Sequence, residues 1–212
     1  MMSYSSARAD HARRKEEFQH GGAAVCKDLT KVIWKAGAVT RALDGVDLSW
    51  RRGSMWDHGA SGSGKTTLLN CISTIDTVSA GAIRLDGQDI TRLRPKELAK
   101  FRRENLGFIF QDFNLLDTLT IGENIALALT IRRTAPQAID PQVQAMANTL
   151  NIGDILDKYP YQVSGGQKQR CACARAIINH PKLVLADEPT GALDSKATDS
   201  FCGFLSRLTP KD

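Results

Sequence analysis

The chain has 212 residues, of which 42% are hydrophobic and 24% charged, and this is the composition of a globular domain with one sizeable core. The formal net charge of +5 suits a polyphosphate ligand or an acidic partner, but it is too small to predict a nucleic-acid partner. No stretch reaches the roughly 20 apolar residues of a membrane span, so we expect any membrane role to pass through a partner. The five cysteines form no C-x-x-C pair and no disulfide ladder, which fits a reducing cytosol.

The first part of the chain is polar. Residues 1–22 lack an apolar period and end in a Gly21-Gly22 break, so we expect a disordered tail before a globular part at 23–212. Short apolar pieces at 23–26 and 42–50 then predict small antiparallel strands.

A glycine-rich loop follows, because GASGSGKT at 59–66 fits the pattern G-x-x-x-x-G-K-[ST]. The backbone N–H groups of such a loop wrap a phosphate chain, Lys65 neutralises it, and Thr66 offers a hydroxyl to Mg²⁺. The next residues have the apolar period of a helix, which would place the phosphates at a helix N-terminus. The alternative is a glycine- and serine-rich turn without function. The candidate nucleotide-binding residues are Gly59, Ala60, Ser61, Gly62, Ser63, Gly64, Lys65, Thr66 and Thr67.

The middle of the chain alternates between strand and helix patterns, which predicts an α/β fold with a mostly parallel sheet. We expect a strand at 82–85, a turn at 86–87, a helix from Pro95, a buried strand at 106–110 that ends on Gln111, a loop at 112–117, a helix at 121–129, and a helix that Asp140 caps and Pro141 opens, reaching about Leu150.

Two later segments carry groups suited to a phosphate site. Ser164-Gly165-Gly166-Gln167 opens a predicted helix and presents N–H groups, a hydroxyl and an amide; the alternative is a simple capped turn. The apolar run at 183–186 predicts a short strand that ends on Asp187-Glu188. Asp187 is placed to hold Mg²⁺ and Glu188 to polarise an attacking water. The alternative is a strand that simply runs into a polar loop.

Taken in order, GASGSGKT, Gln111 after LGFIF, VSGGQKQR at 163–170, LVLADE at 183–188 and GALD at 191–194 resemble the nucleotide-binding subunit of ATP-binding-cassette (ABC) transporters. The resemblance covers about residues 23–208. The segments NCISTIDTVSAG and FIFQDFNLLDTLTIGEN are most similar to the branch paired with FtsX-type permeases, which handles macrolides, lipoproteins and bacitracin-like peptides. This resemblance implies a P-loop NTPase fold with an antiparallel β subdomain and a helical subdomain at about 112–162.

The resemblance also implies an ATPase that energises an exporter from the cytoplasmic face of the membrane, bound there through its permease. Two chains would clamp two ATP molecules, each held by Lys65 and Thr66 of one chain and by Ser164, Gly165, Gly166 and Gln167 of the other. The implied catalytic residues are Glu188 and Gln111, and the implied Mg²⁺ ligands are Thr66, Gln111 and Asp187. The loop after Gln111 would meet the permease.

Two further roles follow from the same resemblance. Asp194 would link the two ATP sites. Adenine would stack on an aromatic side chain near the start of the fold, where the family's tyrosine position falls on Ile33 and the adjacent Trp34 is the candidate; a core tryptophan is the alternative.

This sequence departs from the family pattern in two places. The strand before the glycine-rich loop reads SMWDH at 54–58, and a charged Asp57 is unfavourable in a buried strand, so we expect that strand, with its His58, to be frayed or rebuilt. The chain ends at Asp212, before the position of the family's γ-phosphate histidine. We therefore expect a truncated cassette in which nucleotide binding is better preserved than hydrolysis.

Two other functions compete with the transporter ATPase. A non-transport ABC ATPase, acting on chromosomes or in translation, would be expected to carry a long coiled-coil insertion between Lys65 and Ser164 or two cassettes per chain. A cassette remnant would bind nucleotide or a partner without efficient turnover.

Overall fold

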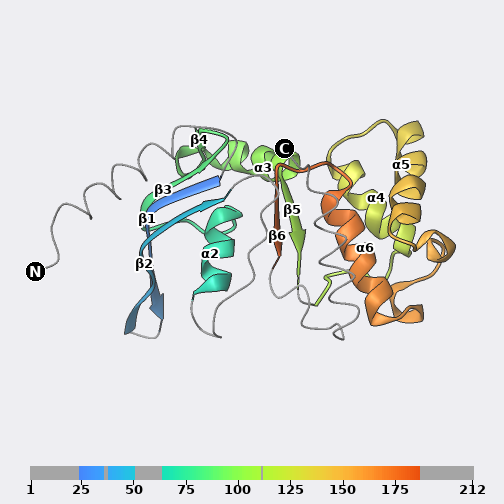
Figure 1. Cartoon of the computed structure of the whole chain (residues 1–212), viewed down its shortest axis with the longest axis horizontal. Helices are drawn as coiled ribbons and strands as arrows, with labels where there is room; N and C mark the ends of the chain where they lie inside the picture. The colour runs from blue at the N-terminus through green and yellow to red at the C-terminus, as the bar shows by residue number, and fades with distance from the viewer. Residues whose placement is uncertain (1–23, 36–37, 51–63, 111, 187–212) are drawn as a thin grey trace, which may run out of the picture.

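The computed structural model describes residues 24–35, 38–50, 64–110 and 112–186 (Figure 1). Several expectations lie outside these ranges: the tail at 1–22, the strand at 54–58, residues 59–63, Gln111, Asp187, Glu188, Asp194 and the end of the chain. The elements are β1 (Ala24–Lys35), β2 (Ala38–Trp50), α2 (Lys65–Ile72), β3 (Ala80–Leu85), β4 (Gln88–Asp89), η1 (Ile90–Arg92), α3 (Pro95–Asn105), β5 (Leu106–Ile109), α4 (Ile121–Ile131), α5 (Pro136–Thr149), η2 (Gly153–Ile155), η3 (Pro160–Gln162), α6 (Gly165–Ile177) and β6 (Leu183–Ala186).

The first part of the chain forms a four-stranded antiparallel sheet in the order β2-β1-β3-β4. β1 and β2 are longer than the short pieces expected from the sequence, because their pairing continues through register shifts between Cys26 and Leu29 and again before Val32. The expected turn at 86–87 joins β3 to β4, and both of its residues have positive φ angles, 49° for Asp86 and 78° for Gly87. This is the backbone shape of a two-residue hairpin turn.

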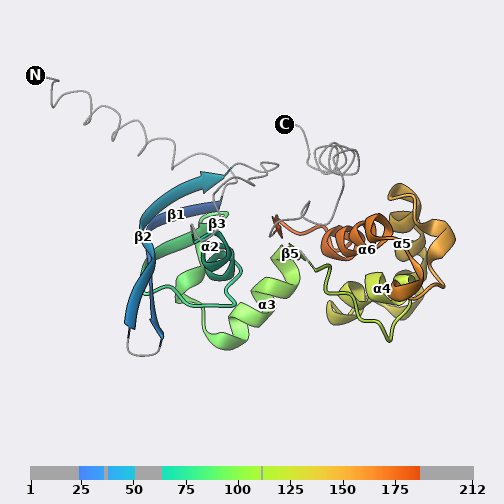
Figure 2. The same cartoon turned by 90° about the horizontal axis from the view of Figure 1, so that it is seen from below.

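β5 and β6 form a separate parallel pair, whose register runs from Leu106 opposite Leu183 to Ile109 opposite Ala186. They lie between the antiparallel sheet with α2 on one side and the helices α4, α5 and α6 on the other (Figures 1 and 2). The predicted α/β class is confirmed, and the antiparallel strands are segregated into their own sheet. Both predicted strands, at 106–110 and 183–186, are present.

One predicted helix start is wrong. α5 begins at Pro136 rather than at Asp140-Pro141, and Pro141 lies inside the helix. Pro136 already occupies the first helical position, where a missing N–H is harmless, whereas Pro141 removes one internal hydrogen bond. The helix continues because its buried face, with Val143 and Ala147, packs into the helical core.

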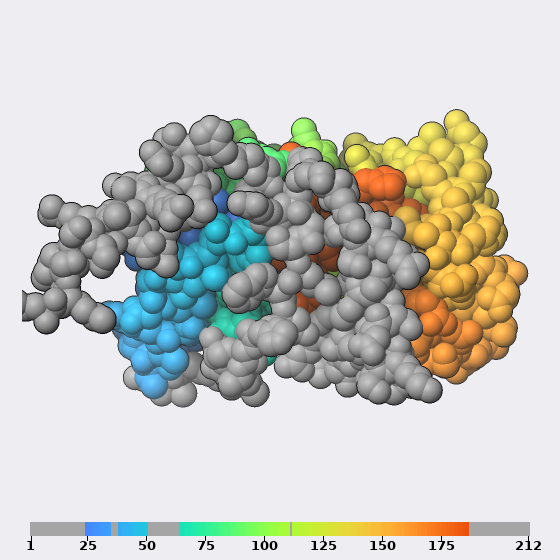
Figure 3. All heavy atoms as spheres, in the orientation of Figure 1, coloured from blue at the N-terminus to red at the C-terminus, as the bar shows by residue number. Residues whose placement is uncertain are grey.

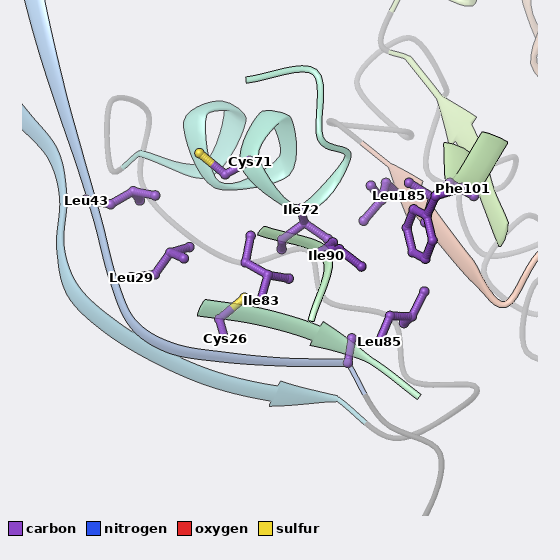
Figure 4. Packing of buried hydrophobic residues seen from close by; sticks show 12 residues of the cluster. Cys26, Leu29, Leu43, Cys71, Ile72, Ile83, Leu85, Ile90, Phe101 and Leu185 are labelled. Atoms are coloured by element: carbon purple, nitrogen blue, oxygen red, sulfur yellow. The ribbon is translucent and has the colours of Figure 1, made fainter. Parts of the chain in front are cut away.

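The buried residues form three hydrophobic clusters. The first joins β1, β2, α2, β3, α3 and the β5–β6 pair, and Figure 4 shows Cys71 and Ile72 of α2 above the strand residues Leu29 and Ile83. The second joins α4, α5 and α6 at the opposite end of the molecule from β1 and β2 (Figure 3). The third is small and packs α6 on the two parallel strands. Among the helices within the described ranges, none has both the length and the apolar character needed to cross a bilayer.

Candidate functional site

The described part of the glycine-rich loop is the start of α2. Gly64 is its N-cap, with φ 85° and ψ 7°, a left-handed conformation that glycine adopts without strain. Its carbonyl oxygen accepts the first helical hydrogen bond, from the N–H of Leu68 at 2.8 Å. Lys65 and Thr66 stand in the first helical turn, where the sequence predicts the phosphate and metal contacts.

Gly64 has a second reason to be glycine. A Cβ built on it would lie 2.6 Å from the carbonyl oxygen of Ala42 on β2, too close for any side chain. The backbone at Gly64 therefore lies directly against the antiparallel sheet. The buried residues Cys71 and Ile72 anchor the other end of α2 in the first hydrophobic cluster. The position of Lys65 is thus set by the antiparallel sheet.

Two of the expected catalytic or metal-binding residues follow the ends of the parallel strands. Ile109, the last residue of β5, pairs with Ala186, the last residue of β6. Gln111 comes two residues after the first, and Asp187 directly after the second, although both lie outside the described ranges. Parallel strands that end in register leave the sheet at the same edge, which is where ligands bind in open α/β sheets.

Ser164 and Gln167 form the predicted helix start. Ser164 is the N-cap of α6, and its Oγ accepts a hydrogen bond from the N–H of Gln167 at 3.3 Å. The Oε1 of Gln167 accepts one from the N–H of Ser164 at 2.9 Å. These reciprocal bonds make a capping box, so the geometry of this turn is fixed within the chain.

The two glycines between them have free space where a side chain would stand. A Cβ on Gly165 would meet no heavy atom of the described chain within 4 Å, and one on Gly166 would meet only Nη1 of Arg170, at 3.8 Å. Glycine is therefore not required here by packing within the described residues, in contrast to Gly64. An open glycine turn beside a helix N-terminus leaves room for another molecule to approach the backbone N–H groups.

The two halves of the expected site do not meet within one chain. α2, with Lys65 and Thr66, lies on one side of the β5–β6 pair, and α6, with Ser164 at its start, lies on the other (Figures 1 and 2). This separation agrees with the expectation that a complete site takes residues from two chains.

Trp34 stands near the end of β1, opposite Val39 of β2, and 78% of it is exposed. The alternative of a core tryptophan is therefore wrong. The adjacent Ile33 is 36% exposed. The hairpin carries an aromatic ring that is available to a flat ligand.

The loop at 112–120 makes contacts that the sequence did not predict. Arg175 of α6 donates from Nη1 to the carbonyl oxygen of Asn114 at 2.6 Å and from Nη2 to that of Phe113 at 2.7 Å. Burial lowers the pKa of Arg175. Asn124, which is fully buried, binds both the N–H and the carbonyl oxygen of Leu116, at 2.8 and 3.0 Å. No local sequence signal identifies these contacts, because the partners of Arg175 lie about 60 residues away along the chain.

Cys171 and Cys173 lie in the core, and both are fully buried. Burial raises the pKa of Cys171 to about 12 and raises the pKa of Cys173 as well. These thiols therefore stay protonated and pack as apolar groups.

Comparison with known proteins identifies relatives for most of the chain. Residues 43–191 match the family described as "ABC transporter". The chain is 52% identical over 170 residues to the bacitracin export ATP-binding protein BceA of Halalkalibacterium halodurans, covering 80% of this chain and 67% of that protein. It is 41% identical over 183 residues to the macrolide export ATP-binding/permease protein MacB of Brucella abortus, covering 86% of this chain and 28% of that protein.

Among solved structures, the dimeric structure of MJ0796, a bacterial ABC transporter cassette, superposes with a TM-score of 0.78 at 35% identity, over 87% of this chain and 82% of that one. The chain spans about 53 to 67% of the length of the first curated relatives that it matches. The glycine-capped start of α2, the in-register ends of β5 and β6 and the capped start of α6 stand within or beside the matched residues. The chain therefore belongs to the ABC transporter family.

Proposed function

We propose that the chain is the ATP-binding and ATP-hydrolysing subunit of a membrane transporter, and that the transporter exports peptides, lipoproteins or macrolides. The observation that carries this proposal is the start of α6. Its capping box is complete within the chain, yet the glycines beside Ser164 are open, and α6 lies across the parallel strands from α2, the helix that begins at Lys65. Half of a phosphate site is thus presented outward, as a composite ATP site requires.

The first half of the site is the glycine-rich loop. Backbone N–H groups of residues 59–64 wrap the phosphates, Lys65 neutralises the β- and γ-phosphates, and Thr67 follows in the same helical turn. Trp34 stacks on adenine, for which its exposure leaves room.

The second half comes from a second copy of the chain. Its Ser164 hydroxyl already accepts the N–H of Gln167, and a hydroxyl has a proton of its own left to donate. Ser164 can therefore donate to a phosphate oxygen without breaking its cap. The open backbone N–H groups of Gly165 and Gly166 and the side chain of Gln167 complete the anion site. Asp194 links the two sites across this homodimer.

The residues present suit Mg²⁺, because a hydroxyl (Thr66), an amide (Gln111) and a carboxylate (Asp187) offer the oxygen ligands that this ion prefers. When bound, Mg²⁺ held by these residues would supply positive charge that neutralises the phosphates. Glu188 polarises the attacking water and accepts its proton, and Gln111 orients that water. The in-register ends of β5 and β6 support the convergence of these groups at one edge of the sheet.

The partner in the membrane is an FtsX-type permease, and the loop at 112–117 meets it. Support comes from the printed names of two relatives, which are ATP-binding proteins of bacitracin and macrolide export. The chain would then work at the cytoplasmic face of the membrane, held there by the permease.

Nucleotide binding and phosphate release on one preparation of the full chain test the proposal. Lys65→Ala is expected to lower MgATP affinity by about tenfold or more, because a charge-assisted phosphate contact is lost. Glu188→Gln is expected to retain binding and to abolish phosphate release. Lys96→Ala, an exposed lysine on α3, serves as the charge-matched control and is expected to behave as wild type.

Two results would contradict parts of this proposal. Failure of the wild-type chain to bind MgATP would overturn the nucleotide site itself. Binding without phosphate release by the wild type would support the remaining candidate, a cassette that binds nucleotide without turnover, which the charged Asp57 just before the glycine-rich loop in the sequence favours.

A further inference from the structure

The helix α3 carries a row of cations to which the proposed function gives no role. Lys96, Lys100 and Arg103 stand four and three residues apart on α3, so they share one face of the helix and form a basic stripe. Lys96 and Lys100 are exposed, and so is Ala99 on the same face, whereas Phe101 on the other side of the helix is buried. The basic stripe therefore faces solvent and not the core.

The acidic side chain that stands among these residues is occupied elsewhere. Glu97 accepts three hydrogen bonds from Arg94, one from the backbone N–H and two from the guanidinium, at 2.9, 3.3 and 2.9 Å. Within the part of the chain that the structure describes, neither Lys96 nor Lys100 makes an ion pair. Their positive charges are therefore available to another molecule.

An exposed apolar side chain stands near the same helix. Arg102 on α3 donates from Nη1 to the carbonyl oxygen and to Oγ1 of Thr74, at 2.9 and 3.1 Å. These bonds hold the turn after α2 against α3, so the next residue, Ile75, lies near this helix. Ile75 is 59% exposed. An apolar side chain beside a row of lysines is the combination that interfacial helices present to a bilayer.

The position of α3 in the molecule agrees with a membrane contact. In Figure 2, α3 and α4 lie along the same, lower side of the molecule, and the chain that joins β5 to α4 passes along that side as well. Residues 112–117 of this connection are the segment that we propose to meet the permease. A permease bound there brings the bilayer to the side on which α3 lies, so this step of the argument rests on the proposed function.

The charge and the chemistry of the stripe favour a lipid surface. Anionic headgroups give the cytoplasmic leaflet a negative surface potential, which attracts lysine and arginine side chains close to it. A lysine ammonium on its flexible stem suits such a diffuse field, because it needs no partner of fixed geometry. We propose that the basic stripe and Ile75 form a contact surface for the anionic phospholipid headgroups of the bilayer. The subunit then touches the membrane directly as well as through its permease.

Co-sedimentation of the full chain with lipid vesicles tests the proposal. The vesicles contain phosphatidylcholine alone or a mixture with the anionic phosphatidylglycerol, at low salt, where surface charges are least screened. Lys96→Gln/Lys100→Gln is compared with Lys27→Gln/Arg41→Gln, a control that removes the same charge from exposed positions on β1 and β2. Lys96→Arg/Lys100→Arg keeps the charge. Thermal unfolding and MgATP titration of each variant establish that the fold and the nucleotide site are intact.

The wild type is expected to bind the anionic vesicles and not the neutral ones. Lys96→Gln/Lys100→Gln is expected to weaken this binding about tenfold or more, and the control by less than about twofold, because only the stripe lies at the surface of the bilayer. The arginine variant is expected to bind as the wild type does. Equal losses in the two glutamine variants would overturn the role of the stripe, since the overall positive charge would then account for the binding.

Ile75→Ser is expected to weaken binding to the anionic vesicles about threefold, because a buried apolar contact is lost. Val39→Ser is the control, since Val39 is 54% exposed on β2, and it is expected to bind as the wild type does. Equal binding by these two variants would overturn the contact of Ile75 with the bilayer.

Two further results would overturn the assignment to lipid. Displacement of the chain from the vesicles by soluble glycerol phosphate at matched ionic strength would show a site for a single phosphate group. A wild type that binds polyglutamate through Lys96 and Lys100, but does not bind the anionic vesicles, would assign the stripe to an acidic protein segment. A wild type that binds the vesicles but not MgATP would refute the proposed function while still supporting the lipid contact.

Discussion

The carbonyl oxygen of Ala176 on α6 lies against Gly107 of β5 so closely that a Cβ on this glycine would stand far inside van der Waals contact. The glycine in the LGFIF run thus lets the helix that carries Ser164 pack directly on the strand that leads to Gln111. The third hydrophobic cluster, with Ile109, Cys173 and Ile177, surrounds this contact.

Replacing Gly107 by alanine is expected to destabilise the protein by about 1–3 kcal/mol, because the backbone of β5 or α6 must shift. Denaturant unfolding measures the change. Gly122→Ala is the matched control, since its Cβ would meet the carbonyl oxygen of Leu156 at 3.3 Å, a contact that a small shift relieves. Equal midpoints for the two variants would show that the packing of α6 on β5 is looser than described.

Alanine substitutions at Gly64 and Gly87 distinguish the cost of backbone strain from the cost of a steric clash. Both have positive φ angles, 85° and 78°, but a Cβ on Gly64 would lie 2.6 Å from the carbonyl oxygen of Ala42, whereas one on Gly87 would meet nothing within 4 Å. Gly87→Ala is expected to cost about 1–2 kcal/mol from left-handed strain alone. Gly64→Ala is expected to cost more and also to weaken MgATP binding, as followed by unfolding and by nucleotide titration. A Gly64→Ala variant that matches Gly87→Ala in stability would contradict the close approach to β2.

The ion pair between Lys31 and Asp76 makes the stability of the folded protein depend on pH. Lys31 Nζ lies 2.6 Å from Oδ1 of Asp76 and also donates to the carbonyl oxygen of Thr77 at 2.6 Å. The hydrogen bond from Lys31 lowers the pKa of Asp76 below its ordinary value. The stabilisation is therefore fully present above the pKa of an unfolded aspartate, about 3.9, and is lost as the pH falls through the lower folded value.

Asp76→Asn is accordingly expected to lower the melting temperature at pH 7, and the difference from wild type is expected to shrink below about pH 4. Asp44→Asn is the control, because the Arg41–Asp44 pair is exposed on both sides, at 68 and 69%, and an exposed pair contributes little. A difference at Asp76 that stays constant down to pH 2.5 or so would rule out the ionic origin of this stabilisation.

Substitutions of Trp34 test the proposed contact with adenine. Because Trp34 is 78% exposed, Trp34→Ala is expected to change stability by no more than about 0.5 kcal/mol. Loss of a base-stacking surface is expected to weaken ATP binding about tenfold, and Trp34→Phe is expected to keep most of the affinity. Titration with ATP and with inorganic triphosphate distinguishes the base from the phosphates, and an equal loss for both ligands would exclude stacking.

The sequence predicted those elements that are determined by residues close together in the chain. The start of α6 at Ser164 follows from the serine and glutamine three residues apart, and the strands at 106–110 and 183–186 follow from short apolar runs between polar segments. The helix start at Pro141 was wrong because two prolines offered the same local signal, and packing of the helical face decided between them.

The contacts that fix the positions of the site residues were not predictable in this way. Ala42 lies 22 residues from Gly64, and Phe113 lies 62 residues from Arg175. The glycine-rich motif explains Gly64 by phosphate binding and does not reveal its close approach to β2. In the sequence, Arg175 looks like any surface arginine of a helix, and only the fold brings the loop at 112–120 against it. The role of a residue in holding an element in place depends on long-range neighbours, which periodicity and motif spacing do not contain.

The burial of Cys26, Cys71 and Cys171 gives the protein built-in reporters of local opening. Cys26 and Cys71 lie in the cluster under the antiparallel sheet, and Cys171 lies in the helical cluster. Burial raises the pKa of Cys26 and of Cys171 to about 12, so the reactive thiolate is scarce as well as shielded. An alkylating reagent at neutral pH therefore modifies these side chains only as fast as their own cluster opens. Mapping which thiols are alkylated first would show whether the sheet and the helices come apart together or one before the other.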